Sequence, residues 1–199
     1  MLEILLATNN AKKAEELRAL LSDLPVTVRS AQDLDDPPRP VEDGNTFVAN
    51  ARIKAVGFGH VATGSHVLAD DSGLEVDALE GRPGVYSSRF AGRDGDDEAN
   101  NRKLLEELRG VPEASRTARF RCVLCLRSPD GDETLAEGVL EGRIADAPRG
   151  GAGFGYDPLF LIPSEGRTLA ELGASFKQQN SHRARALAQM KEEIRSLVR

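Results

Sequence analysis

The sequence predicts an α/β fold built on a long mixed β-sheet flanked by helices. Short apolar runs alternate with amphipathic segments of helical period, which is typical of strand-loop-helix units. Alternating residues at Thr117–Arg127 and Glu133–Ile144, joined by Pro129-Asp130-Gly131, predict an antiparallel hairpin. The 199 residues are 40% hydrophobic and 29% charged, as in ordinary globular proteins. We therefore expect residues 1–199 to form a single domain.

The N-terminal half alternates strands with helices. Apolar runs at Leu2–Ala7 and residues 26–29 predict two strands. Thr46 is a good N-cap for a second helix, and residues 66–70 predict a buried strand that is followed at once by Asp71-Ser72-Gly73. The first helix is expected to begin at Ala11, because leucines recur at helical spacing after it: Leu17, Leu20, Leu21 and Leu24.

The C-terminal half adds two more helices and a glycine-rich loop. Residues 80–97 indicate a long loop, and residues 97–109 a helix that Gly110 ends. Residues 149–155 form the glycine-rich loop, and the apolar residues 159–162 predict a strand after it. A last helix begins after Ser181 and continues to the C-terminus.

Charge and hydropathy exclude several functions. Lys plus Arg number 26 and Asp plus Glu number 32, so the net charge is −6, which argues against nucleic acid as a partner. The apolar run near the N-terminus is too short for a signal peptide, and no run approaches the roughly 18 apolar residues that cross a bilayer. We expect a cytoplasmic protein with no membrane partner.

Cys122 and Cys125 form a C-x-x-C pattern that could indicate zinc or redox chemistry. They lie on a predicted strand, where residues three apart point to opposite faces. Their sulfurs therefore cannot converge on one metal, and we expect two half-buried, reduced thiols.

The first candidate site joins the first strand to the first helix. Free N–H groups and the positive dipole at a helix start attract phosphate, and Lys13 adds a full charge. The alternative is an asparagine-capped helix with solvated lysines. The residues of this segment are Thr8, Asn9, Asn10, Ala11, Lys12 and Lys13.

The second candidate site is Asp70-Asp71-Ser72-Gly73 at the end of a buried strand. Burying an ionised carboxylate without a partner is costly, so these acids need a cation or donors. Oxygen ligands suit Mg²⁺, which prefers one or two carboxylates plus phosphates and water, and Glu42 could supply another carboxylate. A capped turn after the strand is the alternative.

Two further segments could bind a flat, charged ligand. The glycines around Phe154 lead into a strand rather than a helix, which excludes a dinucleotide fingerprint, but they would let the backbone approach a ring that stacks on Phe154. Lys177, His182 and Arg183 could bind phosphates and the edge of a base. A plain turn and a solvated basic helix start are the respective alternatives.

Taken together, these motifs resemble the HAM1-like inosine triphosphate pyrophosphatases, hydrolases of non-standard purine nucleotides. The resemblance covers nearly the whole chain in seven motifs: Ala7-Thr8-x-Asn10-x-x-Lys13, Glu42-x-Gly44-x-Thr46-Phe47-x-x-Asn50-Ala51-x-x-Lys54, Ala69-Asp70-Asp71-Ser72-Gly73-Leu74, Pro83-Gly84-Val85-Tyr86-Ser87-x-Arg89, Phe120-x-Cys122-Val123, Gly153-Phe154-Gly155-Tyr156-Asp157-Pro158-x-Phe160 and Ser181-His182-Arg183-x-x-Ala186-Leu187.

The resemblance implies a homodimer whose subunits have two lobes and an active-site cleft. It implies Mg²⁺-dependent cleavage of purine nucleoside triphosphates, namely ITP, dITP and XTP, to the monophosphate and pyrophosphate, which cleanses the nucleotide pool. The implied substrate is a purine nucleoside triphosphate, and the implied cofactor is Mg²⁺.

The resemblance also implies roles for single residues. Asp71 would accept a proton and bind the metal with Glu42, and Asp70 would lie near it. Thr8 to Lys13 would hold the phosphates, which Lys54 would help to neutralise. The nucleotide would contact Ser72, Phe154, Gly155, Tyr156, Asp157, Lys177, His182 and Arg183. Departures from the family pattern are Lys12 in place of Gly, Ala49 in place of Glu, and Ser175-Phe176 in place of acids.

Two rival functions follow from the same residues. One is a nucleotide phosphatase or a Maf-type pyrophosphatase that acts on modified pyrimidine nucleotides, which product analysis would reveal. The other is a nucleotide sensor, which would bind tightly without turnover in the presence of Mg²⁺.

Overall fold

A computed structural model describes residues 1–198, which contain one seven-stranded sheet in the order β2-β1-β3-β4-β5-β6-β7. β1 pairs in parallel with β2 and β3, whereas β6 pairs antiparallel with β5 and β7. The predicted mixed sheet flanked by helices is therefore confirmed.

The strands are β1 (Leu2–Ala7), β2 (Val26–Ser30), β3 (His66–Val76), β4 (Thr117–Arg127), β5 (Glu133–Ile144), β6 (Phe160–Ile162) and β7 (Arg167–Thr168). The helices are α1 (Ala11–Leu21), α2 (Phe47–Gly59), α3 (Asp97–Glu107), α4 (Leu169–Asn180) and α5 (His182–Leu197). α4 is absent from the predicted elements, although a capping box formed by Thr168 and Glu171 starts it. The predicted loop at residues 80–97 contains a 3₁₀ turn, Gly84–Arg89.

The chain divides into two compact units. The first comprises Met1–Asp71, Cys122–Gly138 and Arg183–Arg199, and the second comprises Ser72–Arg121 and Val139–His182. β3, β4 and β5 each contribute residues to both units.

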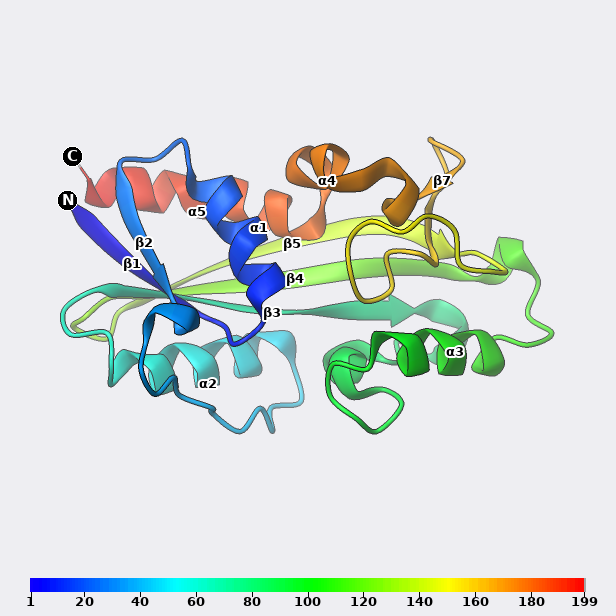
Figure 1. Cartoon of the computed structure of the whole chain (residues 1–199), viewed down its shortest axis with the longest axis horizontal. Coiled ribbons are helices and arrows are strands. Elements are labelled where there is room, and N and C mark those ends of the chain that lie inside the picture. Colours follow the sequence, from blue (N-terminus) through cyan, green and yellow to red (C-terminus); the bar gives the residue numbers. More distant parts are fainter. Residues whose placement is uncertain (199) are drawn as a thin grey trace. The chain divides into compact units, whose positions relative to one another are not determined.

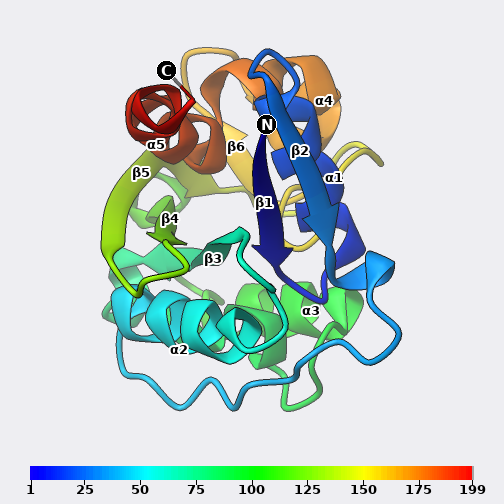
Figure 2. The ribbon, with the colours of Figure 1, turned by 90° about the vertical axis from the view of Figure 1, so that its left-hand side faces the viewer.

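In the first unit, helices cover both faces of the sheet. α1 and α5 lie on one face and α2 lies on the other (Figures 1 and 2). The core under α1 and α5 consists of apolar side chains from β1, β3, β4 and the two helices, among them Ile4, Leu6, Leu17, Leu68, Leu124, Leu187, Met190 and Ile194. The amphipathic leucine pattern of α1 thus packs inward as predicted.

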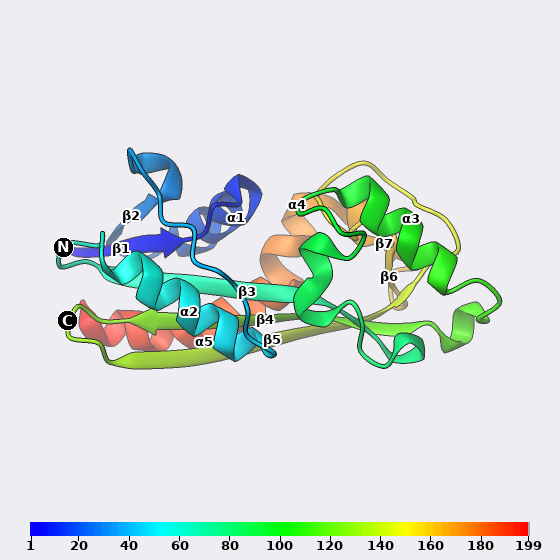
Figure 3. The same ribbon diagram turned by 90° about the horizontal axis from the view of Figure 1, so that it is seen from below.

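The second unit has its own apolar core. α3 contacts the Gly84–Arg89 turn, and α4 contacts β6 and β7 (Figure 3). Its buried side chains include Leu74, Val76, Leu104, Leu108, Phe120, Leu140, Tyr156, Phe160 and Leu169.

The predicted end of the strand at residue 70 is wrong, because β3 continues to Val76. β1 ends at Ala7, opposite Ala69. Beyond that point the Leu74 N–H donates to Ser87 Oγ at 2.9 Å, so a side chain replaces the missing neighbouring strand. Asp70 and Asp71 consequently lie inside a strand, and their side chains leave it on opposite faces.

The two cysteines are free thiols on β4. The prediction that they are half-buried is wrong: both are fully buried, because the two faces of β4 are covered in the first unit. Among residues 1–198, no three or more His, Cys, Asp or Glu side chains form a group that could hold a metal ion.

No helix in the part of the chain that the structure describes has the length and apolarity needed to cross a membrane.

Burial should make both cysteines unreactive in the native protein. It raises the pKa of Cys125 to about 11 and that of Cys122 well above its usual range. At about pH 8, roughly one Cys125 side chain in a thousand is then a thiolate. We expect an aromatic disulfide reagent to label two thiols per chain in guanidinium chloride and almost none in native protein. Prompt labelling of the native protein would contradict this burial.

Candidate functional site

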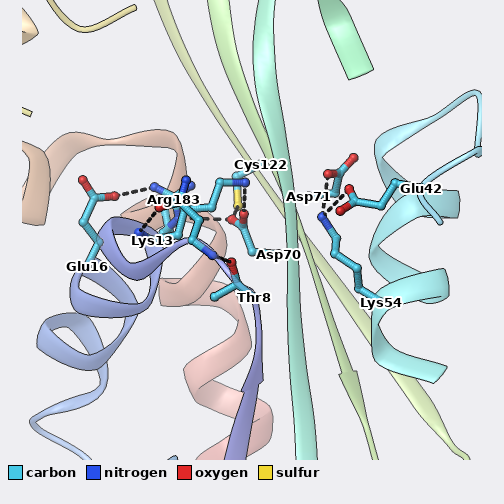
Figure 4. Close-up of polar contacts among 10 residues, drawn as sticks. Thr8, Lys13, Glu16, Glu42, Lys54, Asp70, Asp71, Cys122 and Arg183 are labelled. Carbon is cyan, nitrogen blue, oxygen red and sulfur yellow. Dashed lines mark hydrogen bonds and ion pairs between the residues drawn. The ribbon is translucent and has the colours of Figure 1, made fainter. Parts of the chain in front are cut away.

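Asp70 binds two cations on the face of β3 that carries α1 and α5 (Figure 4). Its carboxylate accepts a hydrogen bond from Lys13 Nζ at 2.6 Å and from Arg183 Nε at 3.1 Å. Cys122 Sγ donates to the same carboxylate at 3.0 Å, and Arg183 also pairs with Glu16. This buried cluster therefore joins the start of α1, the start of α5, β3 and β4.

The cations decide the ionisation of Asp70. Burial alone would raise its pKa, but Arg183, Lys13 and Lys54 outweigh burial and hold the pKa well below its usual range. Asp70 is thus a permanent anion that anchors Lys13 and Arg183.

The Thr8–Lys13 segment connects β1 to α1 as predicted. Thr8 Oγ1 accepts from the Asn10 N–H at 3.1 Å, and Asn10 Oδ1 accepts from the Lys13 N–H at 3.2 Å. Asn10 is therefore the N-cap, as the asparagine-capped interpretation requires. Asn9, Ala11 and Lys12 are exposed, so the start of α1 is also accessible to an anion.

Asp71 lies on the opposite face of β3, toward α2 (Figure 4). Lys54 Nζ donates to Asp71 Oδ1 and to Glu42 Oε2, both at 2.8 Å. The second oxygen of Asp71, Oδ2, is buried and has no hydrogen-bond partner among residues 1–198. The partners of Asp70 therefore differ from those of Glu42 and Asp71, which both contact Lys54.

The electrostatics of Asp71 are the reverse of those of Asp70. Burial raises the pKa of Asp71 and, together with the Glu42 charge, outweighs the lowering by Lys54 and Lys13. The pKa of Lys54 is raised, because Asp71 and Glu42 outweigh the effect of its burial. Lys54 therefore remains charged beside the two carboxylates.

Asn50 on α2 fixes the segment that carries Glu42. Its Oδ1 accepts from the Gly44 N–H at 2.9 Å. A Cβ at Gly44 would lie 2.6 Å from that oxygen, so the close approach requires glycine. Thr46 then caps α2, as predicted. Asn50 is buried, and sequence reasoning gave it no role beyond its place in a motif.

The donors at this position fit a hard divalent cation. Glu42 and Asp71 supply two carboxylates joined by one ammonium group, and Asp71 Oδ2 lacks a partner among residues 1–198. Two carboxylates with the remaining positions left to phosphate and water is the arrangement that Mg²⁺ favours.

In the second unit, Phe154, Asp157 and Lys177 form one cluster. Lys177 Nζ donates to Asp157 Oδ2 at 2.8 Å and lies 4.6 Å from the centre of the Phe154 ring. The same oxygen accepts from the Phe154 N–H at 3.0 Å. Lys177 comes from the last turn of α4 rather than from the start of the last helix.

The other expected nucleotide contacts have defined surroundings. Tyr156 is buried, and its hydroxyl donates to the Ser87 carbonyl at 2.9 Å. His182 stacks on Phe120 with the ring centres 4.9 Å apart. Ser72 follows Asp71 on β3 and is half-buried. The Gly155 peptide binds Asp97 and Asn101, two residues that sequence reasoning missed because no local pattern marks them.

Comparisons with known proteins match nearly all of the chain. The model of the Ham1 family matches residues 4–193. A Geobacter sulfurreducens protein named dITP/XTP pyrophosphatase is 50% identical over 194 residues, which cover 98% of this chain and 97% of that protein. A Rhodopirellula baltica protein of the same name is 51% identical over 192 residues, with 94% and 90% covered.

Solved structures agree with these sequence matches. A HAM1 protein from Coxiella burnetii has a TM-score of 0.86 and 43% identity and covers 98% of this chain and 100% of its own. The Staphylococcus aureus Ham1 protein has a TM-score of 0.85 and 38% identity, with 98% of both chains covered. The chain belongs to the Ham1 family.

Proposed function

We propose that this protein is a Mg²⁺-dependent pyrophosphohydrolase that cleaves ITP, dITP and XTP to the nucleoside monophosphate and pyrophosphate. The observation that carries the proposal is the Glu42-Lys54-Asp71 arrangement, in which Lys54 and Asp71 are buried and Asp71 Oδ2 has no partner among residues 1–198. The names of the relatives from Geobacter sulfurreducens and Rhodopirellula baltica support the substrate class.

Asp71 is proposed as the general base. Its burial raises its pKa, which makes its carboxylate a better proton acceptor than an ordinary aspartate. Asp71 would take the proton of the attacking water, while Lys54 holds Oδ1 in place. Glu42 and Asp71 would hold Mg²⁺, which when bound supplies positive charge against the triphosphate oxygens.

The triphosphate is proposed to bind at the start of α1 and near Lys13 and Lys54. Phosphoryl transfer depends mainly on positioning and on charge neutralisation, for which a helix N-terminus and ammonium groups are suited. Asp70 would serve here by holding Lys13 rather than by binding the metal.

The base is proposed to stack on Phe154, with Gly155, Tyr156, Asp157, Lys177, His182, Arg183 and Ser72 as further nucleotide contacts. Arg183, which pairs with Asp70 and Glu16, is proposed to donate to the 6-oxo group of the base.

A homodimer, a cytoplasmic location and one enzyme domain over residues 1–199 complete the proposal. Family membership supports the dimer, and a nucleotide substrate together with two free thiols supports the cytoplasm. Light scattering that gives the mass of one chain at micromolar concentration would exclude the dimer.

Asp71→Asn should lower kcat by about 10²- to 10⁴-fold, because the amide keeps the shape but cannot accept a proton. Pyrophosphate release from ITP is the measurement. Asp43→Asn, at an exposed carboxylate next to Glu42, is the matched control and should retain full activity. An Asp71→Asn rate within threefold of wild type would remove Asp71 from the role of base.

Glu42→Gln should raise the Mg²⁺ concentration that gives half-maximal rate by at least about tenfold, because one of two carboxylate ligands loses its charge. A Mg²⁺ titration at saturating ITP measures it. An unchanged midpoint with a normal maximal rate would show that Glu42 does not bind the ion.

The wild-type protein should prefer ITP to ATP and to GTP by at least about 10²-fold in kcat/KM. Donors aimed at a 6-oxo group would meet the amino group of adenine and remain unpaired, which is a strong penalty in a buried site. Guanine must be excluded at its 2-amino group instead. Equal hydrolysis of ATP and ITP would contradict the assignment, orthophosphate release would favour a phosphatase, and tight binding without turnover would favour a sensor.

A further inference from the structure

We infer that Asp97 and Asn101 of α3 are positioning residues. Their hydrogen bonds to the backbone of Gly155 hold the Phe154 ring in place for the purine. The inference rests on the proposed function, because it assigns these two residues to the base-binding part of that site. Neither residue belongs to the seven motifs on which the resemblance depends.

Asp97 and Asn101 form hydrogen bonds to both polar backbone groups of Gly155, its N–H and its carbonyl. The Gly155 N–H donates to Asp97 Oδ2 at 2.8 Å, and Asn101 Nδ2 donates to the Gly155 carbonyl at 2.8 Å. Asp97 and Asn101 are four residues apart on α3, so both side chains lie on one face of the helix. A rigid helix thus holds Gly155 at two points.

Phe154 needs hydrogen bonds of this kind to fix its position, because glycines flank it. Gly153 and Gly155 have φ values of +83° and +62°, where other residues are strained. A Cβ at Gly153 would lie 2.0 Å from Asp157 Oδ2, so glycine is required there. Glycines lower the free-energy cost of this backbone conformation, but they also allow the unbound loop to adopt many other conformations. The hydrogen bonds to Asp97, Asn101 and Asp157 select one of them.

The Asn101 side chain is used here as a donor. Its Nδ2 also donates to the Asp97 carbonyl at 2.8 Å, so both of its partners are carbonyl oxygens and the orientation of the amide is fixed. Its Oδ1 is buried and has no hydrogen-bond partner among residues 1–198. An unpaired buried oxygen raises the free energy of the folded protein. The hydrogen bond that Asn101 Nδ2 donates to the Gly155 carbonyl therefore outweighs the cost of leaving Oδ1 unpaired.

The consequence for catalysis is specific. Loss of these hydrogen bonds should weaken binding of the base, because the Phe154 ring must then be ordered when the nucleotide binds. It should leave the groups proposed for the triphosphate and for proton transfer unchanged, because those groups belong to the first unit. KM should therefore rise while kcat stays nearly unchanged.

Four variants test the inference: Asp97→Ala, Asn101→Ala, Asp97→Asn and Arg102→Ala. Asp97→Ala and Asn101→Ala each remove one hydrogen bond. Asp97→Asn keeps an oxygen acceptor for the Gly155 N–H and should rescue the loss. Arg102→Ala removes an exposed side chain of the same helix that pairs with Glu98, and it serves as the matched control.

For each variant we would measure KM and kcat for ITP, the inhibition constant of inorganic tripolyphosphate, and the exchange rate of the Gly155 amide proton by NMR. In the two alanine variants KM for ITP should rise about 3- to 10-fold with kcat within twofold of wild type. Tripolyphosphate carries no base, so its inhibition constant should stay the same. Amide exchange at Gly155 should accelerate at least about tenfold in Asp97→Ala and stay slow in Asp97→Asn and Arg102→Ala.

Equal loss of kcat and of tripolyphosphate affinity in the alanine variants would show general damage to the fold and would overturn the inference. Unchanged KM and unchanged exchange at Gly155 would overturn it as well. A wild-type protein that does not turn over ITP would overturn the proposed function instead, while the exchange rate of Gly155 would still report whether Asp97 holds the peptide.

Discussion

Two adjacent carboxylates inside a buried strand impose a constraint on the first unit. Because neighbouring residues of β3 point to opposite faces, Asp70 and Asp71 cannot share a cation, and each face must supply its own. Lys13 and Arg183 meet Asp70 from α1 and α5, and Lys54 meets Asp71 from α2. The placement of three helices on the two faces thus follows from where these charges are needed as well as from apolar packing.

The two carboxylates differ in what their surroundings let them do. Asp70 contacts two cations, Lys13 and Arg183, and has a lowered pKa, so it is fixed as a structural anion. Asp71 shares a single ammonium group with Glu42 and has a raised pKa. When two neighbouring carboxyl groups have different pKa values because their surroundings differ, they commonly have different chemical roles. Here the difference separates Asp70, which anchors Lys13 and Arg183, from Asp71, which is proposed to accept the proton.

The second unit solves a different physical problem, which is to make a glycine-rich loop rigid. Gly153 and Gly155 permit the backbone path, and groups outside the loop order it. Asp157 and Lys177 contact Phe154, Asp97 and Asn101 contact Gly155, and the Ser87 carbonyl accepts from the Tyr156 hydroxyl. Several weak hydrogen bonds converging on consecutive residues can hold one conformation where the local backbone alone would not.

The sequence by itself determined the short-range features. The spacing of apolar residues located β1 and α1, and alternating residues with a Pro-Asp-Gly turn located the β4-β5 hairpin. Asn10 and Thr46 marked the starts of two helices. Each of these signals depends only on residues that are close in the sequence. The family motifs predicted functional roles for Glu42, Asp71 and Phe154, which stay predictions. Only the tertiary structure decided that β3 continues beyond Asp70, that Asp70 and Asp71 serve opposite faces, and that Asp97 and Asn101 hold Gly155. Those features depend on partners that lie from 13 to more than 50 residues away in the sequence, which no local pattern encodes.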